Sequence, residues 1–319
     1  GRDEAAPLPR GTSPTALFTT NSPSLVIKAA SDAYHRSVYS WQPGSRAVLI
    51  VEGRDLDVTR LSDNTFAAWF SDGHQEQIVT LNEKRVISLP LVLPNGGPRG
   101  WGACEGDSQH VVCIGDRPGM TEQDRDYDET GFTAVLVVDL AARQTNWFSV
   151  GDRTHFRFDQ RREMVYVVDW DSPSSHRPVE AFDLAGKDRG EAPLRDIMPS
   201  SPADQYVESL AEDGSESWEV YNAATMTLVL KFNCDRAGCR EGDNDYAPWN
   251  PKFTDQIVAI RSGGAYGKGG ACDIYQLSPP RLLKPVPCVG LPAYDWSRDG
   301  RELATLQYEG NVFRREPVN

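Results

Sequence analysis

No run of apolar residues in this sequence approaches the roughly 20 that a membrane-spanning helix needs. Basic residues are also scarce, because 33 Lys and Arg stand against 46 Asp and Glu, and the formal net charge is -13. A surface of that sign repels phosphate backbones and anionic lipid surfaces. We therefore expect neither a transmembrane segment nor a nucleic-acid partner.

Sequence motifs of common catalytic sites are missing as well. The 5 histidines occur without an HExxH motif or paired spacing, and no serine lies in a GxSxG elbow. The glycine-rich stretch RSGGAYGKGGAC differs from a phosphate-binding loop, because Ser262 takes the place of its first glycine and Gly269 that of its Ser or Thr. We name no catalytic residue, and the sequence favours a protein that is not an enzyme.

Helical periodicity is absent from nearly the whole chain. Short β-branched and aromatic runs recur instead between clusters of Gly, Pro, Asp and Asn, which is the pattern of strands and turns. With 39% hydrophobic and 9% aromatic residues, the chain is too apolar to be disordered. The sequence predicts a folded all-β protein.

Six segments are similar to one another, and each joins an anchor residue, a polar turn and an apolar strand. They are YSWQPGSRAVLIVEG at Trp41, WGACEGDSQHVVCIG at Ala103, FRFDQRREMVYVVDW at Phe158, MPSSPADQYVESLAED at Ser200, APWNPKFTDQIVAIRS at Trp249 and YDWSRDGRELATLQYEG at Trp296. The anchors lie roughly 42 to 62 residues apart, the length of a four-stranded propeller blade. One blade cannot bury both of its faces alone, whereas blades arranged radially can. The sequence therefore predicts a β-propeller.

We predict six blades, with seven as the alternative. The interval from Trp41 to Ala103 is the longest between anchors, and it holds an extra hairpin-like run, TFAAWFSDGHQEQIVTL, that a seventh blade would use. In the last repeat, Asp299 and Gly300 supply the positive backbone angles that a tight hairpin turn prefers.

The domain boundaries follow from composition. Residues 1–20 are polar and proline-rich, which indicates a flexible leader, and residues 21–319 then form a single propeller domain. Because only 23 residues follow Trp296, the last blade needs a strand from elsewhere. We expect the N-terminal strand SLVIKAAS, residues 24–31, to complete it.

The 6 cysteines fall into three close pairs along the chain. They are Cys104 with Cys113, Cys234 with Cys239, and Cys272 with Cys288. Bridges within each pair suit hairpins and short loops, so we expect three local disulfides and an oxidising compartment. The protein is then secreted, periplasmic or at the cell surface. Zinc binding and buried free thiols in a cytosolic protein are the alternatives, although the spacings differ from paired CxxC motifs.

The repeat DWSRDGRELATLQYEG, together with APWNPKFTDQIVAIRS and SWQPGSRAVLIVEG, resembles the W-S-P-D-G-x-x-I-A-F repeat of TolB-like and related WD40-like propellers. The resemblance covers the repeat cores from Trp41 to Tyr308. It departs from the pattern at Arg298, where the repeat has proline, and the separate N-terminal α/β domain of TolB finds no room in these 319 residues. The resemblance implies a propeller fold and a function in protein binding.

Two loops are the candidate binding sites, because long loops on a rigid scaffold commonly carry recognition. The first is TEQDRDYDETG, with Asp124, Asp126, Tyr127, Asp128 and Glu129, and the second is RSGGAYGKGGAC, with Tyr266 and Lys268. Alternating carboxylates are suited to calcium, but Glu129 and Val135 stand where an EF-hand frame counted from Asp124 needs Gly and Glu. We expect no metal and no cofactor, and calcium at the acidic loop stays open as an alternative.

These observations predict a non-catalytic, secreted or periplasmic binding or scaffold protein. We expect a monomer that recognises a protein partner through loops on one rim of the propeller. The alternative is a propeller hydrolase or lyase that acts on a glycan or a peptide with carboxylates in its central channel.

Overall fold

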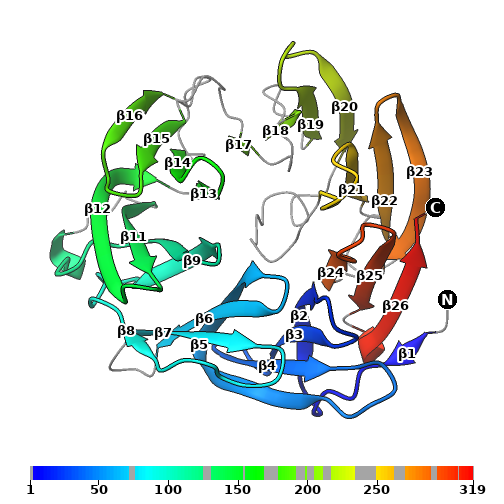
Figure 1. Ribbon diagram of the computed structural model, residues 1–319, viewed down its shortest axis with the longest axis horizontal. Helices are drawn as coiled ribbons and strands as arrows, with labels where there is room; N and C mark the ends of the chain where they lie inside the picture. Colours follow the sequence, from blue (N-terminus) through cyan, green and yellow to red (C-terminus); the bar gives the residue numbers. More distant parts are fainter. Residues whose placement is uncertain are drawn as a thin grey trace. The chain divides into compact units, whose positions relative to one another are not determined.

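The computed structural model describes residues 3–71, 76–124, 131–153, 155–168, 179–191, 198–199, 205–210, 217–233, 249–261, 270–288, 293–307 and 309–318. Within these ranges the chain forms antiparallel β-strands and two short 3-10 helices, η1 (Glu122–Asp124) and η2 (Glu309–Asn311), as Figure 1 shows. The prediction of an all-β fold is confirmed. In the described residues, no helix is long and apolar enough to span a membrane.

The chain divides into two compact units. The first comprises Gly1–Glu52, Glu83–Arg85 and Pro199–Asn319, and the second comprises Gly53–Asn82 and Val86–Met198. Each unit is a succession of antiparallel sheets. The single domain over residues 21–319 stays a prediction.

The second unit contains two four-stranded sheets and part of a larger one. One sheet consists of β9 (Trp101–Gly106), β10 (His110–Gly115), β11 (Phe132–Asp139) and β12 (Gln144–Arg153). The next consists of β13 (His155–Asp159), β14 (Met164–Val168), β15 (Glu180–Asp183) and β16 (Asp188–Glu191). In the larger sheet, β5 (Val48–Ser62) is followed by β6 (Thr65–Ser71), β7 (Glu76–Asn82) and β8 (Leu91–Val92).

The first unit contains the other half of the larger sheet, made of β2 (Ser13–Thr19), β3 (Leu25–Ala30) and β4 (His35–Trp41) beside β5. Another sheet has β17 (Met198–Pro199), β18 (Tyr206–Leu210), β19 (Ser217–Asn222) and β20 (Leu228–Asn233). A third has β21 (Gln256–Arg261), β22 (Gly270–Leu277) and β23 (Pro280–Cys288), and Trp249 forms an isolated bridge to Ile257 of β21. The last has β24 (Ala293–Trp296), β25 (Glu302–Gln307), β26 (Val312–Pro317) and, at its edge, β1 (Glu4–Ala5).

Apolar clusters fill the space between consecutive sheets. In the second unit, one cluster joins the sheet of β6 and β7 to that of β9–β12, and another joins β9–β12 to β13–β16. In the first unit, such clusters join β17–β20 to β21–β23, β21–β23 to β24–β26, and β24–β26 to β2–β4. Strand β10 shows the principle, because its neighbouring residues Val112 and Cys113 belong to different clusters. Sheets buried on both faces by their neighbours are the blades of a β-propeller.

The strand that completes the last sheet comes from the N-terminus, as predicted, but from a different segment. β1 pairs with β26, so that Glu4 lies opposite Phe313 and Ala5 opposite Val312. The predicted segment, residues 24–31, contains β3, which lies between β2 and β4 in another sheet, so this part of the prediction is wrong. Five of the six residues of β3 are buried, and a strand that is apolar on both faces belongs inside a sheet. A short strand suffices at the outer edge.

The N-terminal segment is more ordered than a flexible leader. Residues 1–20 contain both β1 and β2, and Ala16, Leu17 and Phe18 of β2 are buried. β2 also packs against β24. The expectation of a flexible leader therefore does not hold for these strands, because a few apolar residues in a polar, proline-rich stretch are enough to bind it to the core.

One of the aligned repeats occupies a different place from the others. The segments at Ala103, Phe158, Ser200 and Trp296 span the first and second strands of their sheets. The segment at Trp41 instead spans β4 and β5, the third and fourth strands in the order of its sheet. The corresponding hairpin of that sheet is β2–β3, which none of the six aligned segments covers.

The extra run between Trp41 and Ala103 forms strands of its own. It contains β6 and β7, and together with β8 and the C-terminal part of β5 it has the four-stranded antiparallel order of the other sheets. This arrangement favours the seven-blade alternative, while the number of blades itself stays a prediction.

A buried carboxylate connects the N-terminal and C-terminal sheets of the first unit. Asp295 of β24 is 1% exposed and accepts hydrogen bonds from the backbone N–H groups of Thr19 and Trp296, both at 2.9 Å. Arg298 Nη2 lies 3.2 Å from Asp295 Oδ2 and 3.2 Å from Thr19 Oγ1. A buried charge is tolerated when donors surround it, so this network replaces the water that Asp295 loses.

The neighbouring turn shows why the last repeat carries glycine. Gly300 has a φ of 71°, a conformation that other residues avoid, which confirms the prediction for this residue. Asp299 does not have a positive φ, so the prediction for it is wrong. Asn250 Nδ2 donates to Gly300 O at 2.7 Å, and a Cβ at this position would collide with the Asn250 side chain. This hydrogen bond links the turn before β21 to the turn before β25.

We expect Asp295→Ala to lower the free energy of unfolding by about 3 to 5 kcal/mol, because the partly buried Arg298 would lose its counter-charge and the Thr19 and Trp296 N–H groups their acceptor. Asp299→Ala is the matched control, since Asp299 is exposed and accepts bonds only within its own turn from Ser297 Oγ and Arg301 N–H. Urea denaturation of both variants measures the difference. Equal losses in the two variants would contradict this role of Asp295.

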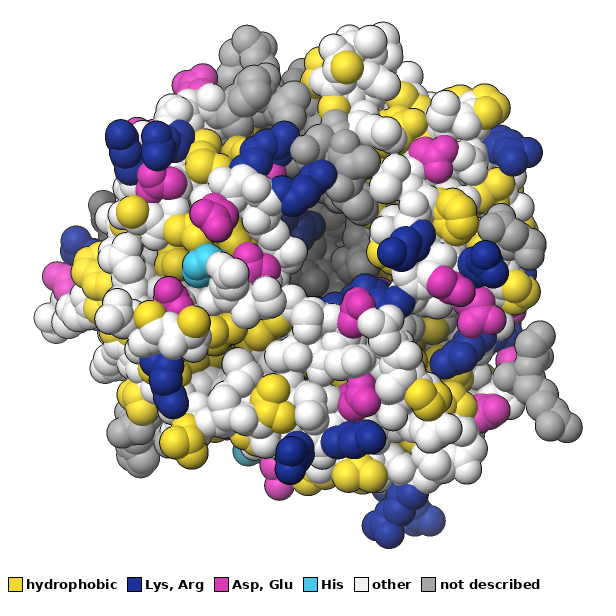
Figure 2. Space-filling model, in the orientation of Figure 1, with side chains coloured by type: hydrophobic (Ala, Val, Ile, Leu, Met, Phe, Trp, Pro, Cys, Tyr) yellow, Lys and Arg dark blue, Asp and Glu magenta, His cyan; other side chains and the backbone are white. Residues whose placement is uncertain are grey.

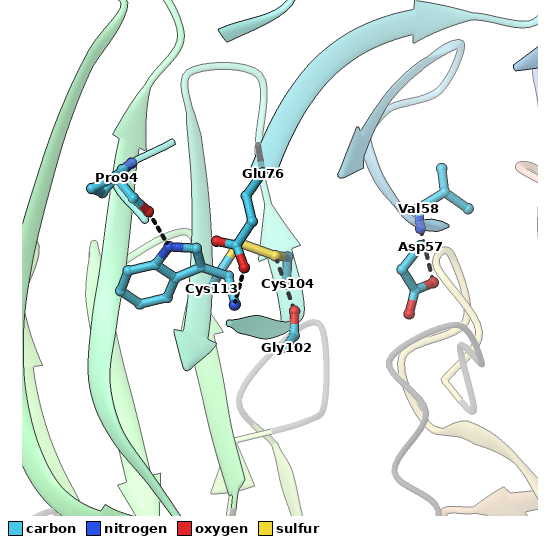
Figure 3. The surroundings of a disulfide bond; sticks show 8 residues. Asp57, Val58, Glu76, Pro94, Gly102, Cys104 and Cys113 are labelled. Atoms are coloured by element: carbon cyan, nitrogen blue, oxygen red, sulfur yellow. Dashed lines mark hydrogen bonds between the residues drawn. A yellow bond between two sulfur atoms is a disulfide. The ribbon is translucent and has the colours of Figure 1, made fainter. Parts of the chain in front are cut away.

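A disulfide between Cys104 and Cys113 closes the β9–β10 hairpin, as predicted. The two residues lie opposite each other in the register, with Cα atoms 4.1 Å apart, and Figure 3 shows the bridge between the strands. Both side chains are buried in the cluster between two sheets of the second unit. Close by, the Glu76 carboxylate accepts the Trp101 backbone N–H, and burial raises the pKa of Glu76.

The other two predicted bridges are described less completely. Cys272 also takes part in a disulfide, and it is fully buried on β22. Its predicted partner lies on the neighbouring strand, where Cys288 pairs with Gly270, but the Cys288 side chain lies outside the described atoms. Cys234 and Cys239 lie outside the described residues. These two pairings stay predictions.

Replacing both bridged cysteines, Cys104→Ala with Cys113→Ala, should lower the free energy of unfolding by about 2 to 3 kcal/mol, because the unfolded chain regains the freedom of a short closed loop. Urea denaturation in non-reducing buffer measures this loss. Peptide mapping without reductant provides the control, since a bridge from Cys104 to any other cysteine would refute the hairpin pairing.

Candidate functional site

The structure describes little of the two loops that the sequence nominates. Six of the candidate residues lie outside the described residues: Asp126, Tyr127, Asp128, Glu129, Tyr266 and Lys268. Asp124 ends η1, and its Oδ2 accepts hydrogen bonds from Thr121 N–H at 2.8 Å and Thr121 Oγ1 at 2.7 Å, which lower the pKa of Asp124. Its carboxylate thus stabilises its own turn, and a binding role for either loop stays a prediction. Elsewhere in the described chain, no group of three His, Cys, Asp or Glu side chains is placed to hold a metal.

A groove of about 720 Å³ opens in the first unit between the β17–β20 and β21–β23 sheets. It is bordered by the residues before β18, the β19–β20 turn, the turn before β21 and the β22–β23 turn. Its lining consists of Gln205, Tyr206, Asn222, Ala224, Lys252, Phe253, Thr254, Asp255 and Ser278. We call it the Tyr206 groove. Its volume is typical of ligand sites in proteins.

Asn250 shapes the wall of the groove. This asparagine is fully buried, and its Oδ1 accepts the backbone N–H groups of Lys252 and Phe253, both at 3.0 Å. Such side-chain bonds hold a turn that the backbone alone would leave loose. In this turn the Phe253 side chain points toward solvent, and 37% of the residue's surface is exposed. An exposed aromatic side chain on a fixed turn is a common feature of contact surfaces.

Tyr206, which lines the groove, stacks on the side chain of Trp249, which lies outside the lining. The rings of Tyr206 and Trp249 lie 6.0 Å apart at an interplanar angle of 16°, and both residues are buried. Burial raises the pKa of Tyr206, the negative charge of Asp255 raises it further, and a hydrogen bond with the Ser278 side chain partly offsets both effects. The Tyr206 hydroxyl therefore keeps its proton at neutral pH and can donate to a ligand.

Asp255 adds a carboxylate beside this hydroxyl. Its Oδ2 accepts a hydrogen bond from Gln276 Nε2, and its backbone carbonyl accepts Leu277 N–H at 2.8 Å. In the part of the chain that the structure describes, no Lys or Arg nitrogen lies within 4.0 Å of its carboxylate. The groove thus offers an acceptor with a full negative charge.

A second groove, of about 400 Å³, lies between the β24–β26 and β2–β4 sheets of the first unit. Its charged side chains are engaged with one another. Arg298 binds Asp295, Asp299 accepts two bonds within its turn, and Arg315 lies 4.0 Å from Glu302. Because these side chains already have partners within the protein, we interpret the second groove as structural. The Tyr206 groove is the better candidate for a ligand site.

Charges of both signs are mixed over the surface. Figure 2 shows acidic and basic side chains next to one another on the face in view. One such ion pair joins Lys284 to Glu316 at 3.0 Å. A mixed surface of this kind does not form a broad patch of one sign there, so recognition depends on local groups.

Sequence reasoning placed APWNPKFTD in a repeat and missed its part in a groove. The available signal was Phe253, an aromatic residue in an otherwise polar turn after the anchor Trp249. Nothing in the sequence indicates that Tyr206 and Asp255 meet across two sheets. Their proximity depends on the pairing of segments about 50 residues apart, the length of one repeat.

Successive antiparallel sheets of this kind define the fold as a β-propeller, and solved structures with WD40-like propellers have a similar fold. The hydrazine synthase of Kuenenia stuttgartiensis matches with a TM-score of 0.56 and 12% identity over 96% of each chain. The Pan2 WD40 domain of Neurospora crassa matches with a TM-score of 0.54 and 10% identity over 99% of this chain and 94% of that one. A chain of the mitotic checkpoint complex matches with a TM-score of 0.57 and 12% identity over 100% and 95%. No protein-family model matches the sequence, and no curated protein matches it. At these identities the likeness shows the fold alone.

We expect Asp255→Asn to lower the pKa of Tyr206 without returning it to the ordinary value, because the repulsion from the carboxylate disappears while burial remains. Carbon-13 NMR of labelled tyrosine follows the titration, and Tyr206→Phe assigns the signal. Glu302→Gln, which removes a carboxylate from the second groove, is the control and should leave the Tyr206 titration unchanged. An identical Tyr206 pKa in wild type and Asp255→Asn would show that the two groups do not interact.

Proposed function

We propose that this protein is a non-catalytic binding or scaffold protein, secreted or periplasmic, that recognises a protein partner through the Tyr206 groove. The observation that carries the proposal is the groove itself. It combines the exposed Phe253, the buried ring of Tyr206 and the Asp255 carboxylate, and side-chain hydrogen bonds hold the turn of Phe253. Aromatic anchors on pre-organised backbone bind with little loss of conformational freedom.

The likeness to WD40-like propellers supports a role in protein interaction. One of the similar chains is part of a mitotic checkpoint complex, an assembly by its name. A rigid propeller with exposed turns suits the same use here.

The cysteines support the proposed compartment. Cys104 and Cys113 form a bridge in the core of the second unit, and such bridges persist in oxidising surroundings. Alkylation of freshly broken cells before denaturation tests this directly, since a cytosolic protein would present these residues as free thiols.

The partner should be recovered from the secreted or periplasmic proteins of the source cells with the intact chain as bait. We expect Phe253→Ala to reduce the recovered partner about tenfold or more, because an aromatic anchor is removed from the centre of the contact. Quantitative mass spectrometry of the bound fraction measures the change.

Leu282→Ala is the matched control for this experiment. Leu282 is an exposed apolar residue on β23, in the same sheet as the groove but outside its lining. Its replacement should leave recovery unchanged. If Phe253→Ala retains the partner as well as Leu282→Ala does, the groove is not the binding site.

A further inference from the structure

Three partly buried carboxylates among the described residues carry a basic partner, whereas Glu76 accepts backbone N–H groups instead. Glu105, Glu219 and Glu316 have side chains that are 14%, 13% and 17% exposed. Each has a nitrogen of an Arg or Lys side chain within 3.0 Å of its carboxylate. The pairing compensates for the water that a half-buried charge loses.

Asp255 departs from this pattern in a place that a partner can reach. It is half-buried and lines the Tyr206 groove, and the described residues supply it with an amide donor, Gln276, but with no basic group. Lys252 lines the same groove, yet it is exposed at the rim and does not pair with Asp255. Among the described residues, Asp255 therefore has no Lys or Arg nitrogen within 4.0 Å of its carboxylate, and a partner can supply one.

From this geometry we infer that the partner inserts an arginine side chain into the Tyr206 groove, with its guanidinium on the Asp255 carboxylate and against the rings of Phe253 and Tyr206. The inference rests on the proposed function and names the chemistry of the contact. The planar guanidinium offers several N–H donors in a fixed fork, so it can bind a carboxylate while its face lies on an aromatic ring.

Two further observations agree with a basic ligand. Burial raises the pKa of Tyr206 and the negative charge of Asp255 raises it further, so the Asp255 carboxylate acts on the same part of the groove as Tyr206. The chain as a whole has a net charge of -13, which attracts basic segments and speeds their encounter. Lysine fits less well than arginine, because its ammonium cannot bind in a fork and stack at once.

The test uses two blocked heptapeptides, Gly-Ser-Ala-Arg-Ala-Ser-Gly and the same peptide with citrulline in place of arginine. Citrulline keeps the shape of the side chain and removes its charge. Titration into the isotopically labelled full chain, followed by NMR, should show the arginine peptide binding about tenfold more tightly than the citrulline peptide, and the Tyr206 signal should shift. The difference should shrink as salt concentration rises.

Variants of the groove separate the charge from the aromatic contact. Asp255→Asn should bring the arginine peptide down to the affinity of the citrulline peptide, while Phe253→Ala should weaken both peptides. Lys252→Ala should tighten the arginine peptide, because a like charge leaves the rim. Glu302→Gln, in the second groove, is the control that should change neither affinity.

Equal affinities of the two peptides, or no saturable binding of the arginine peptide at millimolar concentration, would overturn the inference. So would an Asp255→Asn variant that still prefers arginine. The proposed function survives these results if Phe253→Ala still loses the protein partner. If Phe253→Ala keeps the partner as well, both the groove and its proposed ligand are wrong.

Discussion

The buried carboxylate of Asp295 is the contact on which the first unit depends, since it ties the end of β2 to the end of β24 and so joins the two ends of the chain. The same device recurs between other sheets. Asn250 donates to the backbone of Gly300, and Glu105 accepts the Phe158 N–H while it pairs with Arg157. Apolar packing between sheets has no direction of its own. These hydrogen bonds fix the distance between neighbouring turns, and residues of these turns line the grooves.

The sequence was informative where one residue type has one structural use. The short apolar runs between turns correctly predicted strands, and the recurring anchors correctly predicted a succession of sheets. The close spacing of Cys104 and Cys113 correctly predicted a disulfide within a hairpin. Gly300 could be placed in its turn for the same reason, because few other residues accept its backbone angle.

The predictions were wrong where the sequence alone does not determine which position a strand takes within its sheet. Residues 24–31 and β1 are both N-terminal strands, and only the need to bury both faces separates the inner β3 from the edge β1. The position of the repeat at Trp41 was mispredicted for a similar reason. Trp41 ends β4, the third strand of its sheet, whereas Trp296 ends β24, the first strand of its own. The first hairpin of that sheet, β2–β3, was not recognised as a repeat, and Thr19 at the end of β2 binds Asp295 through its backbone N–H and its hydroxyl group.

The sequence also does not show which carboxylates of the candidate site have a basic partner. Composition reveals that carboxylates outnumber basic groups, but which carboxylate remains without a basic partner depends on the strand register. Glu219 and Lys231 lie opposite each other on β19 and β20 and neutralise one another. Asp255 comes just before β21, where the neighbouring strand presents Gln276 instead. The Gln276 amide satisfies one oxygen of Asp255 and leaves its charge in place, so the strand register makes this carboxylate available to a ligand of the groove.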